Sequence, residues 1–119
     1  MSGDPLSRPL IEIARELRDR RASARELVDA AIARHESVGK RLHAYSFWAP
    51  EQARAVADAA DAAFAAGVSA GPLQGLPVSL KDLFAAEGYP CFAGSSRRLP
   101  ADPGSRTGRL WRRCVASSV

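Results

Sequence analysis

The sequence predicts an α/β fold class, in which a helical N-terminal region precedes a first strand or strands. Two observations lead to this prediction. Apolar residues recur at helical spacing over much of residues 1–70, and the run Leu-Pro-Val-Ser-Leu at 76–80 alternates in the way that a strand does. A chain of 119 residues has the size of one ordinary domain, which is commonly ~100–150 residues.

Two helices are expected in the first forty residues. The first follows Pro9, because proline is acceptable in the first turn of a helix. The second begins at a capping box, in which the Ser23 side chain accepts from the backbone three residues on and Glu26 reaches back. Gly39 marks its end. The inward faces would be Leu10, Ile13, Ala14 and Leu17, then Leu27, Val28, Ala31 and Ile32.

A short strand and a third helix are expected next. Residues 43–48, His-Ala-Tyr-Ser-Phe-Trp, are rich in aromatics that favour strands. Pro50 then opens an alanine-rich helix that ends at Gly67. Its inward face would consist of Ala53, Val56, Ala57, Ala60 and Phe64.

The alternating run 76–80 places Lys81 at the end of a strand. Glycines and a proline at 71–75 break the helical pattern before it. Pro77 restricts the run to the start of a strand or to a sheet edge. In α/β architectures the end of a strand is where chemistry usually occurs, so Lys81 is a candidate functional residue.

Charge and cysteine content narrow the class of protein. Residues 97–119 carry six Arg and one Asp, whereas residues 1–96 carry 11 basic and 12 acidic residues, so a near-neutral body precedes a basic tail. The N-terminus is charged and has no long apolar core, so we expect neither a signal peptide nor a membrane span. Cys91 and Cys114 form no disulfide framework and no metal-ligand spacing, and the cytoplasm is the expected compartment.

Lysine is rare in this chain, which has 17 basic residues of which only Lys40 and Lys81 are not arginine. Arginine cannot be deprotonated in a protein and so cannot act as a general base. Lysine can, if burial and neighbouring charges lower its pKa. A position that must gain and lose a proton would therefore be lysine even in an arginine-rich chain.

The segment Gly-Pro-Leu-Gln-Gly-Leu-Pro-Val-Ser-Leu-Lys-Asp at 71–82, followed by Ala-Gly-Ser at 93–95, resembles the amidase signature family. The resemblance extends over roughly residues 7–102. It implies a helical N-terminal region at 1–70 and the start of the catalytic core at 71–103. The fold would then be that helical region plus the first strand or strands of the amidase signature mixed sheet, which these residues leave incomplete.

The resemblance also implies a mechanism of the Ser–cis-Ser–Lys type. Lys81 would be the catalytic base that draws a proton, through a bridging serine, from the serine that attacks the amide carbonyl. The residues that match the motif around it would have supporting roles: Asp82, Gly75, Pro77, Gly94 and Ser95. Water would release the acid from the acyl-serine, and neither a metal nor an organic cofactor is implied.

The serines of this mechanism are not expected among the 119 residues. In the family both serines lie downstream in a Gly/Ser-rich segment. Ser95 and Ser96 match a turn of the family, and the serines of the final Ala-Ser-Ser-Val lack the glycines of an oxyanion loop. We therefore expect this chain alone to be inactive. Its partners would be a small-molecule amide for the complete enzyme and, through its apolar helix faces, a second copy of the chain, but no membrane.

The tail 104–119 has two interpretations. Codon degeneracy permits a shifted frame from Thr107 that reads Gly-Pro-Leu-Val-Ala-Ala-Leu-Arg-Arg-Val-Val-Gly, a helix running into a strand as the family has here. The tail would then be a frameshift product. The alternative is a small basic binding module, in which Trp111 and the six Arg of residues 97–119 contact nucleic acid or an acidic partner. No organised face or RNA-binding motif supports that alternative.

Overall fold

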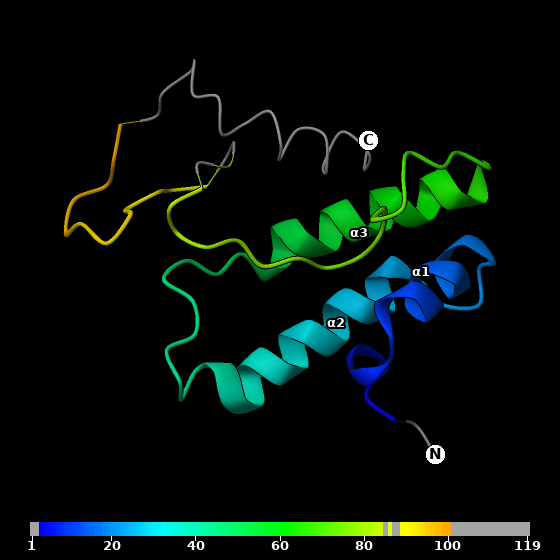
Figure 1. The fold of residues 1–119 in the computed structure, drawn as a ribbon, viewed down its shortest axis with the longest axis horizontal. Coiled ribbons are helices and arrows are strands. Elements are labelled where there is room, and N and C mark those ends of the chain that lie inside the picture. The colour runs from blue at the N-terminus through cyan, green and yellow to red at the C-terminus, as the bar shows by residue number, and fades with distance from the viewer. Residues whose placement is uncertain (1–2, 85, 87–88, 101–119) are drawn as a thin grey trace.

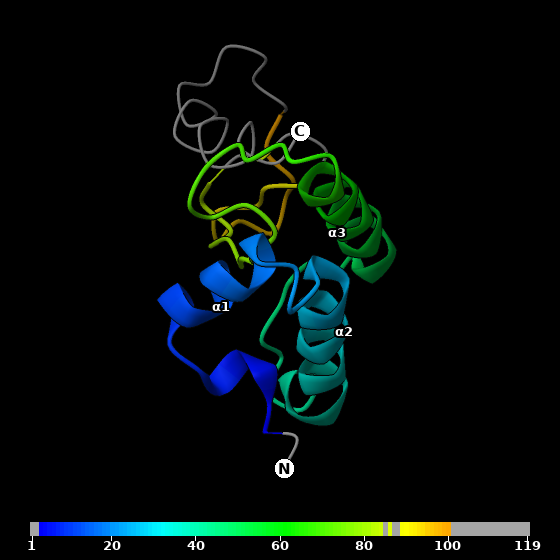
Figure 2. The same cartoon turned by 90° about the vertical axis from the view of Figure 1, so that its right-hand side faces the viewer.

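The computed structural model describes residues 3–84, 86 and 89–100. Three α-helices dominate it: α1 (Leu10–Arg18), α2 (Ala24–Arg34) and α3 (Pro50–Ala65). A short 3-10 helix, η1 (Pro5–Ser7), precedes α1, and a π-helical turn, η2 (His35–Gly39), extends α2. Helices α2 and α3 pack against each other, and the segment after α3 returns alongside α3 (Figures 1 and 2).

Local signals place the three helices much as the sequence predicts. The capping box is present, since the Ser23 side chain accepts from the Glu26 N–H at 3.1 Å while Glu26 accepts from the Ser23 N–H at 3.0 Å. The second helix is predicted to end at Gly39; α2 itself ends at Arg34, and the π-helical turn η2 continues it to Gly39. Gly67 ends α3 with φ +74°, and the Val68 N–H donates to the Ala63 carbonyl at 2.9 Å, which is a Schellman closure.

The core is a small cluster where the three helices meet. Leu17 and Leu27 are the largest side chains that are fully buried in it. The alanines of α2 and α3 allow the two helix backbones to approach closely, because they add little side-chain bulk. The buried cluster consists of Ile13, Leu17, Ala24, Leu27, Val28, Ala57 and Ala60.

Two of the predicted inward positions are wrong. Leu10 is 58% exposed and Val56 is 47% exposed. Helical spacing tells which side chains share a face, but it does not tell whether another element covers that face along its whole length. Ala53, Phe64 and Ile32 pack only at the margin of the core.

The predicted strands are not confirmed. None of the described residues is in a strand, and residues 43–48 and 76–80 are irregular. A strand is defined by its ladder of hydrogen bonds, and no backbone hydrogen bond joins residues 77–80 to another segment within the described part of the chain. The helical half of the α/β prediction is therefore present, while the sheet is not. The basic tail at 104–119 lies outside the described residues.

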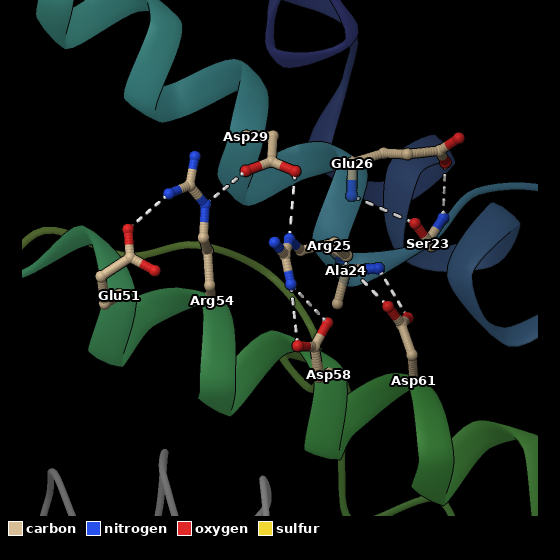
Figure 3. Close-up of polar contacts among 9 residues, drawn as sticks. All are labelled: Ser23, Ala24, Arg25, Glu26, Asp29, Glu51, Arg54, Asp58 and Asp61. Carbon is tan, nitrogen blue, oxygen red and sulfur yellow. Dashed lines mark hydrogen bonds and ion pairs between the residues drawn. The ribbon is translucent and has the colours of Figure 1, made fainter.

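Polar contacts fasten α2 to α3 (Figure 3). Asp61 of α3 accepts from the backbone N–H groups of Ala24 at 2.7 Å and Arg25 at 3.0 Å, which lie in the first turn of α2. The Arg25 guanidinium also donates to Asp58 at 2.8 Å. The guanidinium of Arg54 bonds to Asp29 and holds the pKa of that carboxyl below its usual value.

No helix in the described ranges is long and apolar enough to cross a membrane.

Candidate functional site

Lys81 lies at the end of an irregular segment and its side chain is exposed. The Lys81 carbonyl accepts from the Phe84 N–H at 3.0 Å, so the chain turns directly after the lysine. No ion pair of Lys81 is present within the described ranges. The side chain is therefore available at the surface of this part of the molecule.

The segment that leads to Lys81 is anchored on the helices at Gly75. This glycine has φ +77°, a conformation that costs an L-residue roughly 1–2 kcal/mol. A Cβ at this position would lie 3.0 Å from Phe64 Cε2 and 3.3 Å from the Ala24 Cβ. Leu76 packs against the core cluster and Pro77 is half-buried. The motif glycine therefore allows the chain to approach α2 and α3 closely.

Asp82 joins the Lys81 segment to the Ala-Gly-Ser turn. Its carboxylate accepts from the Phe92 N–H at 2.9 Å, and its carbonyl accepts from the Ala93 N–H at 2.8 Å. The Cys91 thiol also donates to that carbonyl at 3.4 Å. Two motifs that are ten residues apart in the sequence are thus held together by one residue.

The turn at 93–95 is closed by its own backbone. Ala93 and Gly94 have φ +48° and +79°, and the Ser95 N–H donates to the Phe92 carbonyl at 2.8 Å. The Ser95 hydroxyl oxygen accepts from the Arg97 N–H at 3.1 Å. The contacts of Ser95 are therefore those of a turn residue, and they do not bring its hydroxyl to Lys81.

A groove of about 340 Å³ runs beside Lys81 and Asp82. Its walls come from residues 44–50 and 53, at the start of α3 and just before it, and from residues 78–82, 84, 86, 89 and 90. The rings of Phe47 and Tyr89 meet edge-to-face across these segments, with centroids 5.7 Å apart. The remaining aromatic residues of the groove are Tyr45, Trp48 and Phe84. A second hollow, of about 370 Å³, lies at the α1–α2 connection and includes none of the predicted site residues.

One buried polar residue near the site was missed from the sequence. Gln74 occupies the variable position of the Gly-Pro-Leu-x-Gly motif and is only 2% exposed. Its side chain bonds to the backbone of the loop at 68–70. Nothing in composition or spacing distinguishes it from the exposed Gln52. No group of three or more His, Cys, Asp or Glu side chains in the described part of the chain could hold a metal ion.

Comparison with known proteins identifies the family. The profile of the family described as Amidase matches residues 26–103. The chain is 44% identical over 91 residues to a 2-amino-5-chloromuconic acid deaminase of Comamonas testosteroni, covering 76% of this chain and 20% of that protein. It is 51% identical over 79 residues to the A-subunit of the glutamyl-tRNA(Gln) amidotransferase of Granulibacter bethesdensis, covering 66% of this chain and 16% of that protein.

The chain therefore spans about a fifth of the length of these curated relatives. No solved structure matches it. The family match includes both motifs of the site, the Lys-Asp segment and the Ala-Gly-Ser turn. On this evidence the chain belongs to the amidase family.

Proposed function

We propose that this chain supplies the lysine base of an amidohydrolase that cleaves carboxamides to a carboxylic acid and ammonia or an amine. The base is Lys81. Asp82 and the Gly94–Ser95 turn support its segment, and Gly75 and Pro77 set its approach to the helices. The observation that carries the proposal is the position of Lys81 and Asp82 within the family match at 26–103, with Asp82 bonded to the turn of the second motif.

The proposed step begins at the Lys81 amine. The unprotonated Nζ accepts a proton relayed through one serine from a second serine, whose oxygen then attacks the carbonyl carbon. The Lys81 ammonium returns that proton through the relay to the leaving nitrogen, so collapse of the tetrahedral intermediate expels a neutral amine. Water, losing a proton to the same base, then attacks the acyl-serine; the acid leaves and the proton returns to the serine oxygen. A lysine is unprotonated near neutral pH when it is buried and lies near other cations. Lys81 is exposed here, and neither serine of this relay is assigned among the 119 residues. On this proposal the chain alone is inert.

The substrate of the complete enzyme is a small-molecule carboxamide. The names of the two relatives refer to a chloromuconic acid derivative and to a glutamyl-tRNA amidotransferase, so they do not point to one common substrate. The proposal therefore stays at the class of bond that is cleaved. A cytoplasmic location and a homodimer formed through apolar helix faces belong to the same proposal.

A chimaera tests the role of Lys81. The segment of the Comamonas testosteroni deaminase that matches this chain is replaced by the matching residues of this chain, and turnover of the deaminase substrate is measured. Lys81→Ala should lower kcat/KM by about 10²–10⁴-fold, the range for loss of a general acid–base group. Lys40→Ala is the matched control, because it removes the only other lysine and should leave kcat/KM unchanged.

Two results contradict the proposal. One is a chimaera that keeps its activity after Lys81→Ala. The other is an isolated 119-residue chain that hydrolyses aliphatic or aromatic amides and continues to do so after the same substitution.

The basic tail at 104–119 remains a prediction with two interpretations. Sequencing the gene from the Gly94 codon onward decides whether the shifted frame opens into a Gly/Ser-rich segment with two serines. The binding-module alternative requires salt-dependent association with nucleic acid or an acidic protein that disappears when residues 104–119 are removed.

A further inference from the structure

Gln74 holds the loop between α3 and the Lys81 segment. Its Oε1 accepts from the Ala70 N–H at 2.6 Å and its Nε2 donates to the Val68 carbonyl at 3.3 Å. The backbone N–H of Gln74 donates to the Gly71 carbonyl at 3.3 Å. One buried side chain therefore satisfies a donor and an acceptor of the loop that it closes, which is a costly arrangement to break.

Gly75 and Leu76, which directly follow the loop 68–74, pack against the core. Gly75 fits against Leu17, Ala24 and Phe64 only because it has no Cβ, and Leu76 packs on the same cluster. These contacts of Gly75 and Leu76 with the core, called the seat below, require the backbone before Gly75 to hold a fixed position and direction. The Gln74 bonds supply that constraint, because they tie the chain to Val68 and Ala70 of the loop that follows α3.

The seat in turn limits where Lys81 can lie. Lys81 lies five positions after Leu76, so an extended chain reaches at most about 18 Å from Leu76. On the other side, Asp82 is bonded to Phe92 and Ala93. Lys81 thus lies between two attachments, of which the first depends on Gln74.

We propose that Gln74 is a positioning residue for Lys81: by closing the 68–74 loop it fixes the segment that presents the lysine. This inference rests on the proposed role of Lys81 as the base. Gln74 has no part in proton transfer and acts only through the placement of the chain. A base must lie within hydrogen-bond reach of the proton it takes, so a loose segment lowers catalysis even when the lysine itself is present.

The test measures local order in the full 119-residue chain by ¹⁵N relaxation and amide hydrogen exchange. Gln74→Met keeps an unbranched side chain and removes both hydrogen bonds. Exchange of the Ala70 amide should speed up about two- to tenfold, as expected for loss of one hydrogen bond. The order parameter of the Lys81 amide should fall below its value in the parent chain, toward the range under about 0.6 that marks flexible backbone. Gln52→Met, at an exposed position of α3, is the matched control and should change neither.

A second variant separates positioning from general destabilisation. In Gln74→Glu the protonated acid can accept from Ala70 and donate to Val68, whereas the carboxylate can only accept. The variant should match the parent chain at pH 4. At pH 7 it keeps the Ala70 bond and loses the Val68 bond, so the order parameter of the Lys81 amide should fall below that of the parent chain while the Ala70 amide retains its acceptor. Core amides of Leu17 and Leu27 should exchange as in the parent chain in every variant.

Three outcomes overturn the inference. They are an unchanged Lys81 order parameter in Gln74→Met, an equal loosening of Leu17 and Leu27, and a Gln74→Glu variant that behaves alike at both pH values. None of these measurements uses catalysis. A failure of the inference is therefore distinguishable from a failure of the proposed function, which the Lys81→Ala chimaera reports.

Discussion

Asp61 is expected to stabilise the start of α2 from its position on α3. Its carboxylate accepts from the N–H groups of Ala24 and Arg25, two of the four donors that a helix N-terminus leaves without partners. In Asp61→Ala both donors lose their protein acceptor (Figure 3). Asp61 is half-buried, so each of the two hydrogen bonds should stabilise the first turn of α2 by about 1 kcal/mol. The substitution should therefore destabilise that turn by about 2 kcal/mol.

Hydrogen exchange at the two amides measures this effect directly. A loss of about 2 kcal/mol corresponds to roughly 30-fold faster exchange of the Ala24 and Arg25 amides. Asp58→Ala is the matched control, because Asp58 lies one turn earlier on α3 and contacts only the exposed guanidinium of Arg25. That control should change the exchange by less than about threefold. If Asp61→Ala exchanges no faster than Asp58→Ala, the cap does not act as inferred.

Three further predictions follow from the fold and the site. In urea unfolding, Gly75→Ala should lower the free energy of unfolding by about 2 kcal/mol more than Gly67→Ala does. Both glycines have positive φ, but only a Cβ at Gly75 would meet Phe64. Equal losses would contradict the close approach at Gly75. The Arg8 guanidinium holds the pKa of Glu16 below its usual value, so this pair stabilises the fold above about pH 4 and the contribution is lost as pH falls further. Glu16→Gln should therefore reduce the acid-induced loss of helical circular dichroism, and an unchanged acid profile would refute that linkage. The isolated chain should release no ammonia from benzamide or acetamide, and measurable turnover would contradict the inference that the 119 residues lack the serines of the relay.

Sequence patterns identified the features that depend on neighbouring residues. The Ser23–Glu26 capping box and the end of α3 at Gly67 are local, because the partners lie within five residues of each other. The motif around Lys81 was recognisable for the same reason. The match of the chain to the family covers residues 26–103 and includes this motif. Gly39 marks the end of the helical segment, but the change from α-helix to π-helix after Arg34 was not predicted.

Features that depend on distant contacts could not be predicted in this way. Asp61 bonds to residues 36 and 37 positions earlier, and no spacing rule connects it with the start of α2. The strand expected at 76–80 is not confirmed, because alternation indicates a face but supplies no pairing partner. Val56 was placed inward by its spacing, yet nothing in the described part of the chain covers it fully.

The most direct test of the central claim is Lys81→Arg in the deaminase chimaera. Arginine keeps the positive charge and much of the length of lysine, but it cannot give up its proton. If Lys81 is the base, kcat/KM should fall as far in Lys81→Arg as in Lys81→Ala, by about 10²–10⁴-fold. If Lys81→Arg retains most of the activity, the position requires only a cation, and Lys81 is not the base of the reaction.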